Sequence, residues 1–130
     1  MKMRINHEQT GRNDLARIHI SDLEKDIKIL QVTDSHITDS DERDPEAKTH
    51  VENRGQNGFY KNTPNGESCL NVFEQTMAMG HKCGVDGCVL TGDIIDFPTW
   101  KSIDDLSLMI KRFQAPVLFT PGNHDWSFPD

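Results

Sequence analysis

The sequence of 130 residues has no apolar run long enough to cross a bilayer, and its first 25 residues are polar and mixed in charge. We therefore expect no membrane partner and no signal peptide. Basic residues are scarce relative to acidic ones, 14 against 21, and the formal net charge is −7. This balance argues against binding to polynucleotides or anionic membranes, because such binding depends on basic side chains that neutralise phosphates.

Cysteine and apolar residues are also sparse. The three cysteines, Cys69, Cys83 and Cys88, are odd in number and form no Cys-x-x-Cys pair, so we expect reduced thiols and a cytoplasmic location. Hydrophobic residues make up 35% of the chain, and the mean hydropathy is −0.64. A core of this size suits a single α/β unit that carries long polar loops.

Apolar periodicity predicts an α/β fold with elements in the order β-β-α-β-α-β. The expected strands are 16–21, 27–33, 87–91 and 116–120, and the expected helices are 67–82 and 100–113. We expect a polar arm at 1–14, a hairpin turn at 22–26, and a long polar loop at 38–66 within the domain that spans 15–130. Alternation of strand and helix indicates parallel strands joined by right-handed crossovers.

Three polar motifs stand at the ends of predicted strands: Asp34-Ser35-His36, Gly92-Asp93-Ile94-Ile95-Asp96 and Gly122-Asn123-His124-Asp125. The carboxyl ends of parallel strands share one edge of the sheet, which is where open α/β sheets bind ligands. Carboxylates suit Mg and Mn, imidazoles suit Zn and Fe, and two ions about 3.5–4 Å apart can promote in-line displacement at phosphorus. The motifs therefore predict a dinuclear metal site for phosphate ester hydrolysis.

Each motif also has an ordinary structural explanation. The first could be a helix cap with a surface histidine, the second a turn with acidic residues, and the third a turn after Pro-Gly. Their occurrence in order, each at a strand end, favours a common site instead. His50 and Tyr60 could line a substrate pocket from the long loop, although a solvated loop is the simpler interpretation. Trp126 could cover the site or simply pack.

With these motifs, residues 27–130 resemble the calcineurin-like metallophosphoesterase superfamily, whose pattern is DxH, GDxxD, GNH(D/E), a lone His and GHxH. The resemblance implies a β-sandwich of two sheets flanked by helices, of which this sequence is the amino-terminal part. It also implies hydrolysis of a phosphate monoester or diester, and the motifs are more similar to the cyclic-nucleotide and general phosphodiesterase-like branch than to the protein phosphatases. A nucleotide is accordingly an expected substrate.

The resemblance assigns a role to each motif residue. The implied metal ligands are Asp34 and His36 for the first ion, Asp93 as the bridge between both ions, and Asn123 for the second ion. His124 would protonate the leaving group, and Asp96 would orient the His124 side chain. Asp125 would support the site without binding metal. The implied cofactors are two divalent ions among Mn, Fe, Zn and Mg.

The lone His and the GHxH motif of the superfamily pattern are absent from this sequence. The first metal keeps three ligands and the second keeps two, so we expect an incomplete second site, weak metal binding and little or no activity for this chain alone. The alternative function is a non-catalytic binding or scaffold protein on the same fold. A truncated fragment would make inactivity accidental, and an exposed sheet edge would favour self-association.

Overall fold

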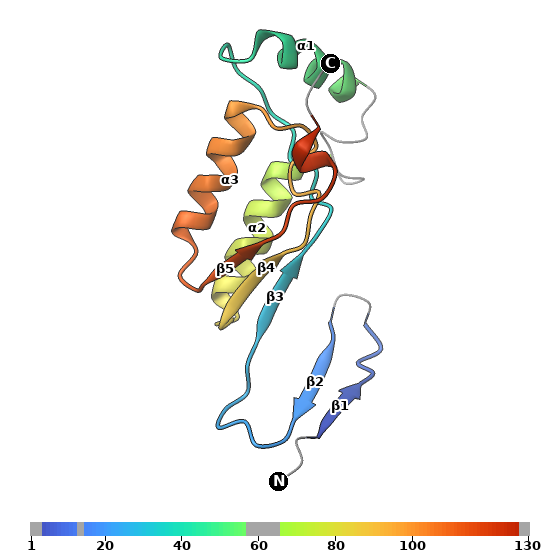
Figure 1. Cartoon of the computed structure of the whole chain (residues 1–130), viewed down its shortest axis with the longest axis vertical. Helices are drawn as coiled ribbons and strands as arrows, with labels where there is room; N and C mark the ends of the chain where they lie inside the picture. The colour runs from blue at the N-terminus through green and yellow to red at the C-terminus, as the bar shows by residue number, and fades with distance from the viewer. Residues whose placement is uncertain (1–3, 13–14, 57–65, 128–130) are drawn as a thin grey trace.

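The computed structural model describes residues 4–12, 15–56 and 66–127 (Figure 1). These residues form a mixed α/β fold with two sheets and three α-helices, which confirms the predicted fold class. The elements are β1 (Ile5–Glu8), β2 (Arg17–Ile20), β3 (Ile29–Val32), α1 (Pro45–Gln56), α2 (Cys69–Lys82), β4 (Gly87–Leu90), α3 (Trp100–Arg112), β5 (Val117–Phe119) and the 3-10 turn η1 (His124–Trp126). Within the described ranges, none of the helices combines the length and the apolar character that a membrane span requires.

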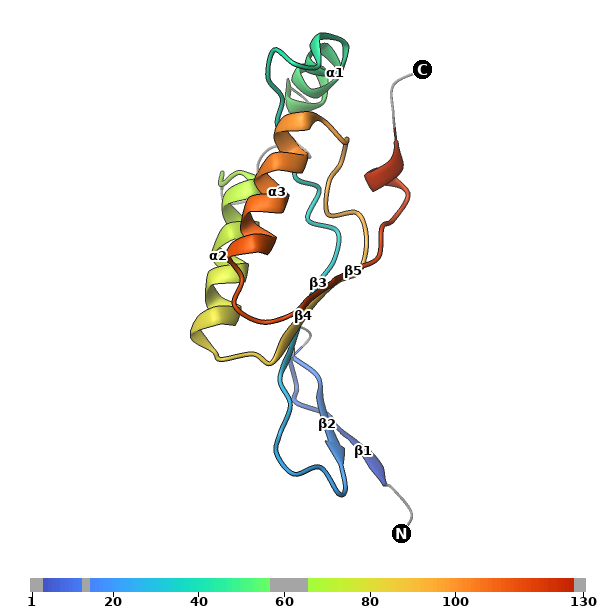
Figure 2. The ribbon, with the colours of Figure 1, turned by 60° about the vertical axis from the view of Figure 1, so that its left-hand side comes forward.

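The larger sheet contains three parallel strands in the order β3-β4-β5, with Leu30 opposite Cys88 and Cys88 opposite Val117. Helices α2 and α3 lie side by side on one face of this sheet (Figure 2). The main core lies between them and includes Phe73, Leu90 and other buried apolar side chains. The sheet therefore presents the carboxyl ends of all three strands at one edge, as the sequence predicted.

Both core helices begin at a hydroxyl side chain. Ser68 accepts a hydrogen bond from the N–H of Asn71 at 3.1 Å, and Thr99 accepts one from the N–H of Ser102 at 3.0 Å. These side chains satisfy backbone donors that have no partner within the helix. Gly84 follows α2 with φ +62°, a left-handed conformation that glycine adopts without steric cost.

The opposite face of the larger sheet is exposed in the described residues. Side chains alternate across each strand, so Leu30 and Leu90 face the helices whereas Ile29 and Leu118 face away from them. Ile29 is 55% exposed and Leu118 is 68% exposed. The smaller sheet does not cover this face, because the β1-β2 hairpin extends beyond the larger sheet in both views (Figures 1 and 2).

The hairpin replaces part of the predicted polar arm. Strand β1 lies within residues 1–14 and pairs antiparallel with β2, placing Ile5 opposite Ile20. On the polar face Glu8 contacts Arg17 at 2.9 Å and His19 at 2.8 Å. Cross-strand ion pairs of this kind stabilise β1 although it contains few apolar residues. A search for apolar alternation alone does not detect such a strand. The turn predicted at 22–26 therefore connects strands of different sheets and closes no hairpin.

The segment before β3 is attached to the larger sheet by Asp86. One carboxylate oxygen contacts Lys25 Nζ at 2.9 Å, and the other accepts the backbone N–H of Lys28 at 2.9 Å. The hydrogen bond from the Lys25 side chain and, to a smaller extent, the one from the Lys28 backbone lower the pKa of Asp86. Asp86 therefore fixes where β3 enters the sheet.

Helix α1 lies inside the segment predicted as a long loop. Pro45 stands at its first position, where a fixed φ favours helix and the missing N–H is not needed. Ala47 and Val51, four residues apart, pack with Phe97 into a small second core. Two apolar residues in a polar helix give too weak a periodicity for detection from sequence.

Candidate metal centre

The first two motifs meet at the carboxyl edge of the larger sheet through backbone hydrogen bonds. The N–H of Asp34 donates to the carbonyl of Gly92 at 3.0 Å, and the N–H of His36 donates to the carbonyl of Asp93 at 3.0 Å. One residue later, a parallel bridge joins Ile37 to Ile95. The loop after β3 therefore follows the loop after β4 step by step, and its side chains are presented to the same space.

Backbone strain is concentrated at the same positions. Asp34, His36 and Asp93 have φ values of +53°, +44° and +51°, a region that residues with a side chain seldom adopt. Such conformations cost on the order of 1–3 kcal/mol each and persist where surrounding contacts enforce them. For Asp93, the third motif supplies such contacts through His124 and Asp125.

Gly122 brings the third motif against Asp93. A Cβ at residue 122 would lie 2.2 Å from Asp93 Oδ1 and 2.7 Å from the Asp93 backbone nitrogen, so only glycine fits. Two residues later, the N–H of His124 donates to Asp93 Oδ1 at 3.0 Å. This bond holds the carboxylate of Asp93 in a fixed orientation beside the third motif.

Asp125 ties the second and third motifs together, which is the supporting role that the resemblance implied. Its Oδ2 accepts the N–H groups of Asp93 and Gly122, both at 2.8 Å, and its Oδ1 accepts the N–H of Ile95 at 2.9 Å. Hydrogen bonds to a carboxylate are stronger than those between neutral groups. Asp125 therefore binds three backbone donors, and it belongs to neither of the two described groups that are spaced for metal binding.

One group of side chains has the geometry of a metal site. Oxygen and nitrogen atoms of Asp34, His36 and Asp93 lie within 4.8 Å of one another, and His36 Nε2 lies 4.0 Å from Asp34 Oδ1. Two carboxylates and one imidazole form a mixed donor set that suits Mn, Fe or Zn. These residues therefore fit the first metal position assigned to them from the sequence.

A second group places Asp96 between two imidazoles. The side chain of Asp96 is 1% exposed, and its Oδ1 lies 2.9 Å from His124 Nδ1 and 3.4 Å from His36 Nδ1. The two rings stand edge to face with centroids 4.7 Å apart. A buried carboxylate is stable only with such partners. Because the Nδ1 atoms face Asp96, the Nε2 atom of each ring faces the opposite way.

Asn123 precedes η1, and its carbonyl accepts the Trp126 N–H at 3.3 Å and the Ser127 hydroxyl at 2.9 Å. Residue 123 is exposed at the same edge of the sheet as Asp93. Among the described acidic, histidine and cysteine side chains, the two groups spaced for metal binding both include His36. Its assignment to a second metal remains a prediction from the sequence.

Sequence reasoning missed a cleft of about 270 Å³ beside the first metal position. Asp34 and Ser35 line it from the end of β3, and Cys69 and Phe73 line it from α2. Burial raises the pKa of the Cys69 thiol, and the nearby charge of Asp96 adds to this effect. No periodic pattern marks such a cleft, because its walls come from segments far apart in the chain.

His50, considered as lining a substrate pocket, and Trp126, considered as cover for the site, have different surroundings. The ring of His50 contacts the ring of Phe97 with centroids 4.7 Å apart, and Phe97 directly follows Asp96. The interpretation of His50 as part of a loop is wrong, because the residue lies in α1. Trp126 is 66% exposed, so it does not serve as a packing residue within the described structure. Tyr60 lies outside the described residues.

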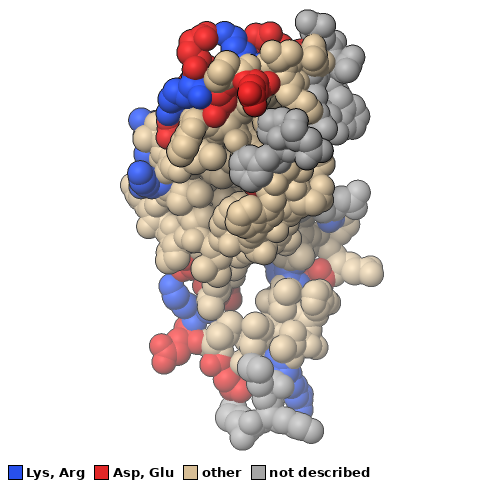
Figure 3. Space-filling view, turned by 45° about the horizontal axis from the view of Figure 1, so that its top comes forward, with Lys and Arg blue, Asp and Glu red and all other residues tan. Residues whose placement is uncertain are grey.

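Charged side chains gather at the end of the molecule where Figure 1 places α1 and again at the opposite end, whereas the middle of the face in view is largely uncharged (Figure 3). The centre itself contains carboxylates and imidazoles, and the residues of the adjoining cleft include neither lysine nor arginine. A phosphate group would therefore depend on metal cations for compensating positive charge at this position.

A sheet of parallel strands with carboxylates and imidazoles gathered at its carboxyl edge defines an α/β protein with a metal-binding site. Comparison with known families matches residues 27–130 to the calcineurin-like phosphoesterases, and the chain belongs to this family. The searches of curated proteins and of solved structures gave no match. The β1-β2 hairpin lies outside the matched residues.

Proposed function

We propose that this chain provides the first metal position and the proton donor of a phosphoester hydrolase. The observation that carries the proposal is the meeting of Asp34, His36 and Asp93 within 4.8 Å, beside the pair formed by Asp96 and His124. Family membership supports metal-dependent hydrolysis of a phosphate ester as the reaction class. We further propose a phosphodiester, such as a cyclic nucleotide, as the substrate, on the basis of the motif resemblance.

Bound divalent ions would supply Lewis-acid stabilisation of the phosphoryl oxygens and would lower the pKa of a coordinated water. Asp34, His36 and Asp93 would hold the first ion, and Asp93 with Asn123 would contribute to the second. His124 would donate a proton from Nε2 to the leaving oxygen, because Asp96 holds the Nδ1 side of the ring. Asp125 would keep Asp93 in place through its three backbone contacts.

The second metal position has only two proposed ligands in this chain, Asp93 and Asn123. We therefore expect one weak divalent site and little or no turnover from these 130 residues alone. Calorimetric titration with Mn²⁺ and Zn²⁺ tests this, with His36→Ala expected to abolish the binding and His81→Ala, on the far end of α2, as the matched control. Two tight sites would contradict the incomplete second position, and the absence of any site would overturn the proposal.

Activity requires a separate assay. The wild-type chain is incubated with para-nitrophenyl phosphate and bis(para-nitrophenyl) phosphate in the presence of Mn²⁺, and phenolate release is followed. Preference for the diester would support the phosphodiesterase assignment. In any longer form of the protein that turns over substrate, His124→Ala should abolish release; undiminished turnover would remove His124 from the proposed role.

The alternative function, a binding or scaffold protein, is favoured by the exposed outer face of the larger sheet. Leu118 and Ile29 on that face are largely solvent-exposed, and strands β3 and β5 end the sheet as edges. Exposed edges and apolar faces promote association. Sedimentation analysis should then show concentration-dependent dimers that Leu118→Lys disrupts.

The free thiols of Cys69, Cys83 and Cys88 support the proposed cytoplasmic location.

A further inference from the structure

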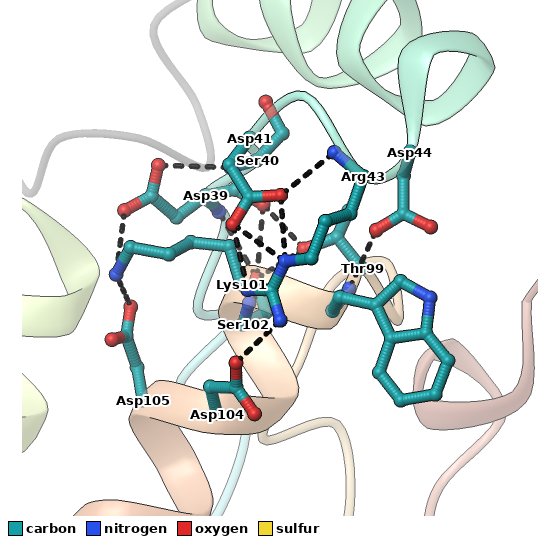
Figure 4. A network of polar contacts seen from close by, with 11 residues as sticks. Asp39, Ser40, Asp41, Arg43, Asp44, Thr99, Lys101, Ser102, Asp104 and Asp105 are labelled. Carbon is teal, nitrogen blue, oxygen red and sulfur yellow. Dashed lines mark hydrogen bonds and ion pairs between the residues drawn. The ribbon is translucent and has the colours of Figure 1, made fainter.

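The chain that leaves the first motif is held by the first turn of α3 (Figure 4). The hydroxyl of Thr99 donates to the carbonyl of Asp39 at 2.6 Å. The hydroxyl of Ser102 accepts the N–H of Asp39 at 3.1 Å and donates to the same carbonyl at 3.1 Å. We call Thr99 and Ser102 the hydroxyl pair. Both backbone polar groups of one loop residue are therefore bound by two side chains of one helix.

Burial makes these bonds obligatory. Both side chains of the hydroxyl pair have no solvent exposure. Thr99 also caps α3 by accepting the N–H of Ser102 at 3.0 Å, so its oxygen is used as donor and acceptor at once. Removing the Ser102 hydroxyl would leave the N–H of Asp39 without this partner in a partly buried place, which is costlier than losing an exposed hydrogen bond.

The position of Asp39 is transmitted back to His36 over three residues. The intervening Ile37 donates its N–H to Ile94 at 2.8 Å, and its carbonyl accepts the N–H of Asp96 at 3.1 Å. The Thr38 hydroxyl donates to the carbonyl of His36 at 3.1 Å. With each step hydrogen-bonded, the short segment cannot shift at one end without moving the other.

His36 needs this support because its backbone is strained. Its φ of +44° and the φ of +53° at Asp34 are conformations that persist only where contacts on both sides enforce them. The upstream contact is the bond from Asp34 to Gly92, already described. The downstream contacts are the two backbone bonds of Ile37 and, at Asp39, the bonds of the hydroxyl pair. Loss of the hydroxyl pair would remove one of these two supports and allow the imidazole of His36 to move relative to Asp34.

Ion pairs surround the hydroxyl pair but lie nearer to solvent. Arg43 bridges Asp41 and Asp104, at 2.6 Å and 2.7 Å, and Lys101 contacts Asp105 and Asp39. Exposed ion pairs are screened by water and salt and contribute little to position. The buried hydroxyls are therefore the part of the network that determines where the loop lies.

We propose that Thr99 and Ser102 are positioning residues that hold His36 in its metal-binding conformation from the first turn of α3. Neither side chain touches metal or substrate; each acts through the backbone of Asp39. The consequence for metal affinity rests on the proposed function of Asp34, His36 and Asp93, whereas the consequence for the conformation of His36 does not.

The test uses the full 130-residue chain with two readouts. Ser102→Ala removes one hydroxyl and leaves the Thr99 cap, and Ser107→Ala makes the same change further along α3 as a matched control. Imidazole ¹⁵N resonances, assigned with His36→Gln, report the environment of His36 without metal. Mn²⁺ affinity is measured by titration. Thr99→Ser retains the hydroxyl and should behave as the wild type.

Ser102→Ala should move the His36 resonances and weaken Mn²⁺ binding about tenfold, as loss of a supporting partner commonly does. Ser107→Ala should change neither. Should Ser102→Ala not fold, Ser102→Cys preserves volume and is measured against Ser107→Cys in the same way. Identical His36 resonances in the Ser102 variant and its control would overturn the proposal.

The two readouts separate this proposal from the proposed function. If the wild type binds no Mn²⁺ but Ser102→Ala moves the His36 resonances, the hydroxyl pair positions His36 and the metal function fails. If the wild type binds Mn²⁺ and Ser102→Ala changes neither readout, the metal function stands and the positioning role fails.

Discussion

Gly122 lies so close to Asp93 that a methyl group on its Cα would be placed 2.2 Å from the Asp93 carboxylate oxygen. The same methyl carbon would also lie 2.7 Å from the backbone nitrogen of Asp93. A flexible side chain could move aside, but the Asp93 backbone is fixed by its bond to Asp125. The third motif can therefore approach the second only through glycine.

Gly122→Ala should accordingly weaken metal binding and lower the free energy of unfolding by about 1–3 kcal/mol, because the loops must separate. Gly84→Ala is the control, since φ is +62° there and a Cβ would meet no atom within 4 Å. That variant should lose stability through strain of about 1–2 kcal/mol and retain metal affinity. Urea unfolding and Mn²⁺ titration measure both. Equal affinities in the two variants would contradict the expected separation.

Asp125→Asn should destabilise the protein by about 2 kcal/mol or more, because an amide group would point a donor at N–H groups that now donate to a carboxylate. Metal affinity should fall too, because the N–H groups of Asp93 and Gly122 both donate to Asp125 Oδ2 and this oxygen keeps Asp93 in place. Asp104→Asn changes an exposed acid in an ion pair and should alter stability by less than about 1 kcal/mol. A comparable loss in both variants would argue against the bridging role.

Asp96→Asn should disturb both imidazoles at once. The carboxylate oxygen near the two Nδ1 atoms fixes which nitrogen of each ring faces outward. An amide in its place would favour different tautomers, which ¹⁵N spectra of the two histidines would reveal. We also expect at least a tenfold loss of Mn²⁺ affinity through His36. If only the His124 signal changed, Asp96 would orient one ring rather than both.

Acid should weaken the contact between Asp41 and Arg43. The guanidinium lowers the pKa of Asp41 from 3.8 to about 2, chiefly through its hydrogen bonds to the carboxylate. The contribution to stability is therefore complete above about pH 4 and disappears as the pH falls through about 2. Asp41→Asn should remove this part of the pH dependence, measured as urea midpoints at pH 6 and pH 2. Added salt should reduce the difference in the wild type, because both groups are exposed.

The elements that could be predicted from sequence are those with strong local patterns. Strand β4 is a continuous apolar run before Gly92, and helix α3 repeats apolar residues on one face after the Thr99 cap. The meeting of three motifs at one edge followed from parallel topology alone. Their side chains come together because strand ends in such a sheet must be neighbours.

The parts that could not be predicted depend on contacts between distant segments. Helix α1 packs on Phe97, the segment just before it is paired with α3 through Arg43 and Asp104, and its own sequence has little apolar periodicity. Strand β1 depends on its partner β2 for its ion pairs. The bonds of Asp125 to Asp93 and Ile95, and those of the hydroxyl pair to Asp39, likewise join residues far apart in the chain. No local sequence pattern predicts them.

The connection from β3 to β4 carries two helices although one suffices to cross the sheet. Helix α2 packs on the sheet, whereas α1 lies beyond the strand ends (Figure 1) and is attached through a three-residue apolar cluster and through the ion pair of Arg43, just before it, with Asp104. Lengthening a connection costs little free energy, about 0.6 kcal/mol for each doubling. In engineering terms, α1 is an insertion whose exposed residues and length can be varied while the residues of the sheet edge are left unchanged.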